Sequence, residues 1–195
     1  MNNKLSELLT EISVLEAELF KELQKQQDEL AFEFRKKRVY FDDKIVARQK
    51  QLVKGIFRYL QDAPLKHIAT IPVIWSCLLP ALIMDVFVTI YQFLCFPVYG
   101  IPKVKRSDYL VFDRQYLQYL NFIEKINCFY CSYFSGLISY TQEIVARTEQ
   151  FWCPIKHAKH IKNLHGRYHV FFKYGDAKYY RDNVQNVRRD FSDLE

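Results

Sequence analysis

The usual signatures of catalysis and export are missing from this chain of 195 residues. Its five glycines form no glycine-rich phosphate loop and no nucleophile elbow, and no pair of carboxylates has a catalytic spacing. The first apolar run long enough for a signal peptide begins near residue 68, so we expect no signal peptide. These absences lower the expectation of an enzyme, but they do not exclude one.

Charge is nearly absent from the middle of the chain. The 34 residues from Ile68 to Ile101 include no lysine, arginine, histidine or glutamate, and one carboxylate, Asp85. As one helix the stretch would be about 50 Å long, whereas the hydrocarbon core of a bilayer is about 30 Å thick. We therefore weigh a single span from Val73 to Cys95 against a membrane hairpin that breaks at Pro80. A buried soluble core is the third interpretation.

Positive charge flanks this apolar stretch on both sides. The flanking cations are Lys54, Arg58 and Lys66 before it and Lys103, Lys105, Arg106 and Arg114 after it. Since positive charge favours the cytoplasm, similar numbers on the two sides favour a hairpin with both ends inside the cell. The net charge of +6 suits an anionic membrane surface or a nucleic acid. Because the basic block 35–66 leads directly into the apolar stretch, we expect membrane lipids as partners and rank nucleic acid second.

Asp85 has the largest energetic consequence of any residue in the stretch. A carboxylate at the centre of a bilayer costs about 3 kcal/mol, so it should be protonated, paired or close to an interface. Proton handling or contact with a partner subunit is the functional interpretation. A neutralised carboxyl group near the interface is the structural one.

Two helical patterns precede the apolar stretch. Leu5, Leu8, Ile12, Leu15 and Leu19 alternate spacings of three and four residues. This spacing is typical of a short coiled coil, so 1–38 is predicted to fold back on the protein or to join a second copy or another protein. The block 39–67 is predicted to be a basic amphipathic helix at the membrane interface.

Four residues in the C-terminal half have the spacing of a metal site. Cys128 and Cys131 are two residues apart in the pattern C-x-x-C, and Cys153 and His157 follow as a second pair. Three sulfur ligands and one nitrogen ligand suit a structural zinc ion, and His160 could replace His157. An iron–sulfur cluster and no metal at all are the alternatives. Five cysteines, an odd number, argue against a disulfide framework and for a reduced compartment.

Helical spacing continues on both sides of the cysteine pair. Aromatic and apolar residues from Asp108 to Asn127 fall on one face of an expected helix. Leu137 to Phe151 is expected to be a second helix, which would carry the chain between the two halves of the metal site.

Four short blocks carry a resemblance to known proteins. They are CFYCSYFSG at 128–136, WCPIKHA at 152–158, CFPVYGIPKV at 95–104 and YGDA at 174–177. Over roughly residues 38 to 181, the chain resembles a group of uncharacterised bacterial membrane-associated proteins. The resemblance implies a shared core built from the apolar segment and the Cys/His region, and it implies no activity.

The sequence as a whole predicts an all-α protein. The expected order is a coiled-coil-like helix (1–38), a basic amphipathic helix (39–67), a membrane-embedded segment (68–101), a helical Cys/His region (102–181) and a polar tail (182–195). We expect a bacterial inner-membrane protein whose metal-binding region is cytoplasmic. The favoured function is a membrane-anchored accessory or scaffold protein with structural zinc. The alternative is a membrane-bound enzyme or redox component that uses the Cys/His site, with Asp85 or His160 as acid or base.

Overall fold

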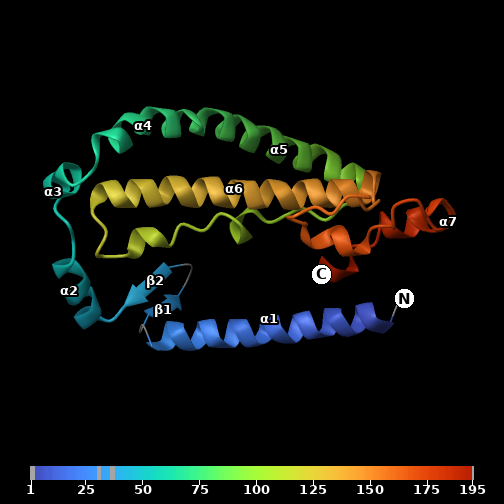
Figure 1. The fold of residues 1–195 in the computed structure, drawn as a ribbon, viewed down its shortest axis with the longest axis horizontal. Helices are drawn as coiled ribbons and strands as arrows, with labels where there is room; N and C mark the ends of the chain where they lie inside the picture. Colours follow the sequence, from blue (N-terminus) through green and yellow to red (C-terminus); the bar gives the residue numbers. More distant parts are fainter. Residues whose placement is uncertain (1–2, 30–31, 36–37, 195) are drawn as a thin grey trace. The chain divides into compact units, whose positions relative to one another are not determined.

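The computed structural model describes residues 3–29, 32–35 and 38–194, and these residues are mostly helical (Figure 1). The helices are α1 (Asn3–Glu29), α2 (Asp43–Gln51), α3 (Ile56–Gln61), α4 (Leu65–Ser76), α5 (Leu78–Tyr99), α6 (Phe122–Trp152) and α7 (Ala177–Val187). The strands are β1 (Phe32–Arg35) and β2 (Arg38–Phe41). Short 3-10 turns are η1 (Arg106–Asp108), η2 (Arg114–Tyr116), η3 (Gly166–Val170) and η4 (Ser192–Leu194). The chain divides into two compact units, Met1–Arg58 with Asp113–Lys125, and Tyr59–Phe112 with Ile126–Glu195.

The first unit contains α1, a two-stranded hairpin and α2. Strands β1 and β2 pair antiparallel, with Phe32 opposite Phe41. The Asp42 side chain caps α2 by accepting a hydrogen bond of 2.9 Å from the Lys44 backbone N–H. The prediction of one amphipathic helix over 39–67 is therefore wrong, because a strand and separate short helices occupy that range. Gly55 and Pro64 interrupt it, and both residue types disfavour a continuous helix.

The segment before α6 completes this first unit. The Gln118 backbone N–H donates to the Gln49 side chain on α2 at 3.1 Å. The Asn121 backbone N–H donates to the Glu124 carboxylate at 2.8 Å, and the Glu124 N–H donates to the Asn121 side chain at 3.0 Å. This reciprocal pair is a capping box, which explains why α6 begins here.

In the second unit, α4 and α5 form a long bent helix rather than a hairpin. Cys77 ends α4 and precedes α5, and it keeps right-handed helical angles, so the chain bends without reversing. A proline ring clashes with the carbonyl group four residues earlier, and the residue four before Pro80 is Ser76, where α4 ends. The predicted break is real, but it is a bend at Ser76 and Cys77. The prediction of two arms folded back at Pro80 is wrong.

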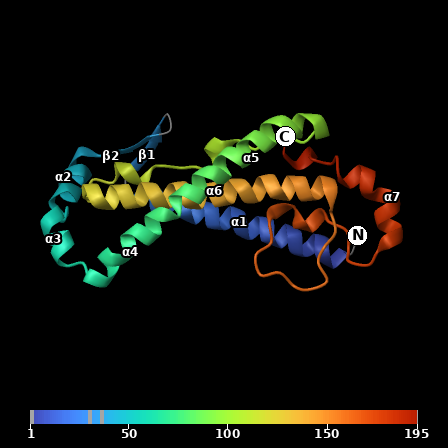
Figure 2. The ribbon, with the colours of Figure 1, turned by 90° about the horizontal axis from the view of Figure 1, so that it is seen from above.

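Helix α6 runs beside α5 in the same direction, and the chain between them returns antiparallel to both (Figure 1). We call residues 101–112 the return segment. Three contacts show its path along the two helices. The Pro102 carbonyl accepts a hydrogen bond from Arg147 of α6, and the Val104 backbone N–H donates one to Gln92 of α5. The Phe112 ring stacks on Phe129 of α6 at 4.8 Å between ring centroids. Seen from above, α4 and α5 cross over α6 (Figure 2).

The return segment is not the helix predicted from Asp108 to Asn127. Eleven residues, from 102 to 112, follow α6 from Arg147 back to Phe129, a distance of about 27 Å at the helical rise. A helix over these eleven residues would cover only about 15 Å, whereas an extended chain covers 27 Å easily. The segment therefore stays largely extended, with one 3-10 turn at η1.

The core of the second unit lies between α5, α6 and the return segment. Its buried residues are Ala81, Phe96, Ile101, Val104, Tyr133, Leu137, Tyr140, Ile144 and Phe191. Gly136 lets the return segment approach α6 closely, because a Cβ atom there would lie 2.6 Å from the Tyr109 carbonyl oxygen. The C-terminal region follows α6: Ile155 forms a parallel bridge with Phe172, and α7 comes next.

Candidate functional site

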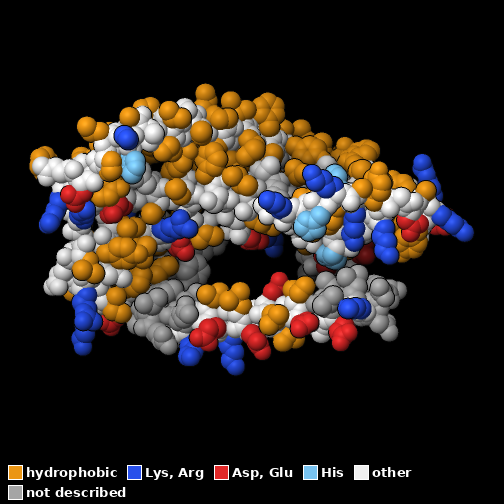
Figure 3. Space-filling view, in the orientation of Figure 1, with side chains coloured by type: hydrophobic (Ala, Val, Ile, Leu, Met, Phe, Trp, Pro, Cys, Tyr) orange, Lys and Arg blue, Asp and Glu red, His pale blue; other side chains and the backbone are white. Residues whose placement is uncertain are grey.

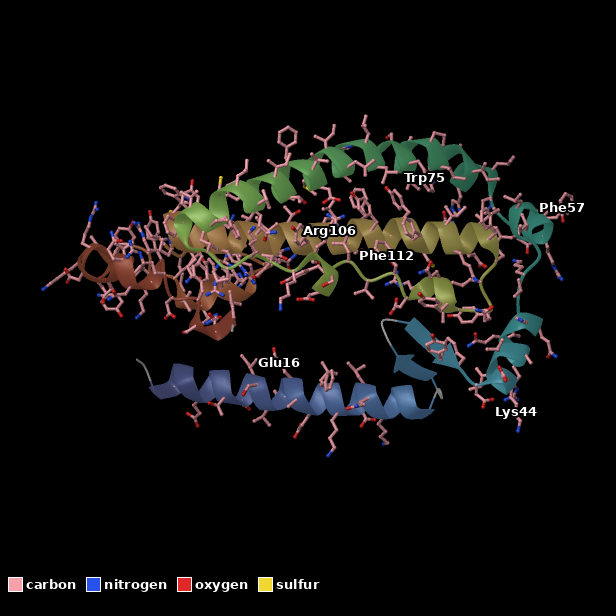
Figure 4. All side chains as sticks on the ribbon, turned by 180° about the vertical axis from the view of Figure 1, so that it is seen from behind. Glu16, Lys44, Phe57, Trp75, Arg106 and Phe112 are labelled. Carbon is pink, nitrogen blue, oxygen red and sulfur yellow. The ribbon has the colours of Figure 1, made fainter. Side chains whose placement is uncertain are left out.

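Asp85 lies on the inner face of α5 and is paired. Arg106 of the return segment donates from Nη1 to Oδ1 and from Nη2 to Oδ2, the second bond being 2.7 Å long. The Tyr133 hydroxyl of α6 donates to Oδ2 at 2.8 Å, and Thr89 donates to Oδ1 at 3.4 Å. Four hydrogen bonds occupy the acceptor capacity of a carboxylate. Figure 4 labels Arg106 between α5 and α6.

The contacts of Tyr133 and Arg106 determine the protonation states of these two side chains. Burial, together with the hydrogen bond to Asp85, raises the pKa of Tyr133 to about 12. The hydrogen bond to Asp85 also raises the pKa of the Arg106 guanidinium. At neutral pH Tyr133 is therefore a neutral donor and Arg106 is a cation. We call Asp85, Arg106 and Tyr133 the carboxylate clamp, because it ties α5, the return segment and α6 together.

Gln92 lies about two turns of α5 after Asp85 and adds further polar contacts to the clamp. Its Oε1 accepts from the Val104 backbone N–H at 2.6 Å, and its Nε2 donates to the Val104 carbonyl at 3.3 Å and to the Tyr140 hydroxyl at 2.9 Å. The side-chain amide thus pairs with extended backbone as a neighbouring strand would. A buried amide satisfied in this way fixes the position of the return segment.

The four predicted metal ligands are not brought together. Cys128 and Cys131 lie in the first third of α6, whereas Cys153 follows directly after its end. The Cys153 N–H still donates to the Glu149 carbonyl at 2.7 Å, so the helical course is unbroken between the two pairs. Twenty-two residues of helix separate Cys131 from Cys153 by about 33 Å. A zinc ion needs its ligands within about 2.3 Å, so these four residues do not fit one site.

The two histidines of the prediction lie in the exposed loop after α6. The His157 backbone N–H donates to the Tyr168 hydroxyl at 2.7 Å, and the His160 side chain is exposed. Within residues 3–29, 32–35 and 38–194, no group of three or more His, Cys, Asp or Glu side chains could hold a metal ion. Zinc binding stays a prediction. Binding of one ion by these four residues would require α6 to unwind between Cys131 and Cys153.

A second polar cluster ties the C-terminal region to α6. Arg167 is 4% exposed, and its Nε donates to the Gln150 side chain while its Nη2 donates to Asp193 at 3.0 Å. Gln150 in turn donates to the carbonyls of Val187 and Asp190 at 2.8 and 2.6 Å. No sequence pattern predicts this cluster, because neither its arginine nor its glutamine belongs to a motif. The cluster holds the end of the chain against α6.

Helices α4 and α5 expose many large apolar side chains within the described structure. We call the following set the outer face: Leu65, Ile68, Ile71, Val73, Ile74, Leu79, Leu82, Ile83, Val86, Phe87, Ile90, Phe93, Leu94 and Val98. Figure 3 shows hydrophobic side chains covering the molecule over these two helices. Leu65–Tyr99 is long and apolar enough to cross a membrane, and almost none of its most apolar window is buried in the protein. The interpretation as a buried soluble core is therefore wrong.

No protein-family model matches the chain, and neither a curated protein nor a solved structure does. The resemblance to bacterial membrane-associated proteins stays a prediction. What can be inferred about function comes from the clamp, the outer face and the placement of the cysteines.

Proposed function

We propose that this protein is a membrane-anchored accessory or scaffold protein of the bacterial inner membrane. The observation that carries the proposal is the exposure of α4 and α5: α4 has no buried residue, and α5 buries only its inner side. That inner side of α5 holds Asp85 of the carboxylate clamp and core residues, whereas the outer face exposes fourteen large apolar side chains.

The size of the outer face favours a lipid environment. Full burial of a large apolar side chain contributes about 1.5 to 3 kcal/mol, and these side chains are already partly covered. At about 1 kcal/mol each, removal of the outer face from water contributes on the order of 15 kcal/mol. Exposed apolar patches of this extent on soluble proteins mark interaction sites. A bilayer covers the whole length of the patch at once.

The first unit supplies the scaffold part of the proposal. In α1, Ile12, Leu15, Leu19 and Leu23 are all exposed, by 47 to 61%. The first three continue the three-and-four spacing of a coiled-coil seam, so a second copy or another protein would cover them. The side chains of Leu5 and Leu8 lie outside the part of the chain whose side chains are described. Neither polar cluster of the second unit presents an open acid, base or nucleophile, which favours a non-catalytic role.

Membrane fractionation tests the anchoring. We expect the full chain in the membrane pellet after a carbonate wash. A double substitution on the outer face, Phe87→Glu with Ile90→Glu, should move the protein to the supernatant because two charges oppose insertion.

The matched control places the same charges on α1, as Leu15→Glu with Leu19→Glu, where equally exposed apolar side chains are lost. This variant should stay in the pellet. A wild-type protein that is monomeric and dissolved without detergent would contradict the proposal.

A further inference from the structure

We propose that α4 and α5 lie in the plane of the membrane and insert into a single leaflet, with both ends of the pair on the same side. This inference rests on the proposed membrane anchoring and goes beyond it, because it excludes both the single span and the re-entrant hairpin. The membrane partner is a leaflet that contains anionic headgroups. Three independent features of the second unit support this placement.

The first feature is the charge beside α5. Arg106 meets Asp85, the eighth of the 22 residues of α5, and Val104 meets Gln92 farther along. The return segment therefore places the exposed Lys103 and Lys105 next to the middle of α5. If α5 crossed the bilayer, these cations and a largely extended backbone would lie at hydrocarbon depth. Irregular backbone and charge are tolerated there only when protein surrounds them.

The second feature is length. Leu65–Tyr99 is 35 residues long, or about 52 Å at the helical rise. A core of about 30 Å would hold it across the membrane only at a tilt of roughly 55°, beyond the range of 0 to 40° that spanning helices show. Lying flat imposes no such limit. The bend at Cys77 then only adapts the arc to the surface of α6.

The third feature is where the apolar side chains lie. Exposed apolar residues continue from Leu65 in the first turn of α4 to Val98 in the last turn of α5, so the outer face has no polar end. Figure 3 shows hydrophobic side chains along the top of the molecule over both helices. A helix with one apolar and one polar side inserts its apolar side to about 5 to 10 Å below the headgroups.

Cations at both ends of the arc favour anionic lipid. Lys66 is exposed in the first turn of α4, and the Lys103 ammonium lies 4.5 Å from the centroid of the Phe93 ring. Lys103 thus borders the outer face. In a flat orientation both lysines meet headgroups of the same leaflet, where each basic residue is attracted by anionic lipid. This also explains why the flanking cations show no bias between the two ends of the stretch.

Spin labels on the outer face measure the depth directly. Single cysteines replace Ile71, Leu82 and Phe93 in a background without the five native cysteines, in vesicles of phosphatidylethanolamine and phosphatidylglycerol. Depth comes from power saturation with oxygen and a nickel chelate. We expect all three labels at the same shallow depth, with a spread below about 5 Å. A label at Leu82 that is deepest while the other two are shallow would mean a hairpin. Depths that run from one leaflet to the other would mean a span.

Labelling from one side provides the second measurement. Lys66→Cys and Lys105→Cys in sealed vesicles should both react, or both fail to react, with an impermeant maleimide added outside. Reaction of only one would overturn the inference. Recovery in the vesicle pellet is scored first, so loss of anchoring is told apart from a wrong orientation. If the cysteine-free background loses its helical circular dichroism, quenching of native Trp75 by lipids brominated at different depths replaces the spin labels. Strongest quenching near the headgroups is expected, and strongest quenching at the bilayer centre would refute the inference.

Discussion

The carboxylate clamp should contribute measurably to stability, and its two partners should contribute unequally. The Asp85 side chain is 12% exposed, whereas the Arg106 side chain is 43% exposed. Arg106→Met leaves a buried carboxylate with Tyr133 and Thr89 as its remaining partners. Removing one partner of a buried pair costs about 3 to 5 kcal/mol, and the partial exposure of Arg106 reduces this to about 2 kcal/mol.

Removal of the acidic partner should cost less. Asp85→Asn leaves Arg106 without a carboxylate, but this half-exposed guanidinium can turn to water. Its expected cost is about 1 kcal/mol. The double variant leaves no buried charge without a partner, so it should cost about 1 kcal/mol less than the sum of the two single variants.

Tryptophan fluorescence during urea unfolding in mild detergent measures these costs. Both tryptophans of the chain, Trp75 and Trp152, belong to the second unit, so the signal reports the unit that holds the clamp. Lys105→Met is the matched control, because it removes one cation from the neighbouring exposed position and should change stability by less than about 0.5 kcal/mol. Equal effects of Arg106→Met and Lys105→Met, or strictly additive effects in the double variant, would refute the reasoning.

Other substitutions test the rest of the second unit. Gly136→Ala should lower the stability measured by thermal melting by about 1 to 3 kcal/mol, because the new Cβ atom would lie 2.6 Å from the Tyr109 carbonyl oxygen. Gly166→Ala is the control, because a Cβ atom there has no neighbour within 4 Å, and its effect on stability should be small. Burial acts to raise the pKa of Asp193, but its hydrogen bonds and attraction to the buried arginine outweigh burial and lower that pKa. Its stabilisation is thus complete above a pH of about 4 and is lost as the pH falls through the folded pKa, so Asp193→Asn should lower the melting temperature at pH 7 and not at pH 2. Elemental analysis should give equal zinc contents for wild type, Cys128→Ser and Cys153→Ser. Loss of one equivalent of zinc in both variants would mean that α6 unwinds.

The helical class and the apolar segment could be predicted because both depend on local composition. The separation of the four predicted metal ligands could not be predicted, because spacing alone is ambiguous. Two cysteines separated by two residues face the same side in a zinc knuckle and also in an α-helix, where residues three apart are neighbours. The capping box at Asn121 and Glu124 starts α6 before the cysteines and so decides for the helix. The sequence contains that box, and it was the available sign that Cys128 and Cys131 are helical.

The return segment shows a different limit. Its aromatic residues fall at helical spacing, yet the chain has to cover about 27 Å in eleven residues, and only extended backbone does so. That requirement comes from α5 and α6 running in the same direction, which no local pattern encodes. The partner of Asp85 follows from the same cause. Arg106 is 21 residues away from Asp85 in sequence. By sequence position alone it counts among the flanking cations, although a buried carboxylate needs a cation as its partner.

The clamp and the orientation of the anchor are physically linked. In a transmembrane helix Asp85 would need a partner within the bilayer, and that partner would bring its own charge and backbone into the hydrocarbon. Here Arg106 approaches from the side of α5 opposite the outer face, and it is joined there by Tyr133 of α6. The one carboxylate in the apolar stretch therefore marks which side of the helix faces protein and water. The exposed apolar side chains on the other side of α5 mark the side that faces lipid in the proposed orientation. By composition α5 looks like a spanning helix, but these contacts make it polar on one side, and the proposed flat orientation is the one that amphipathic helices take.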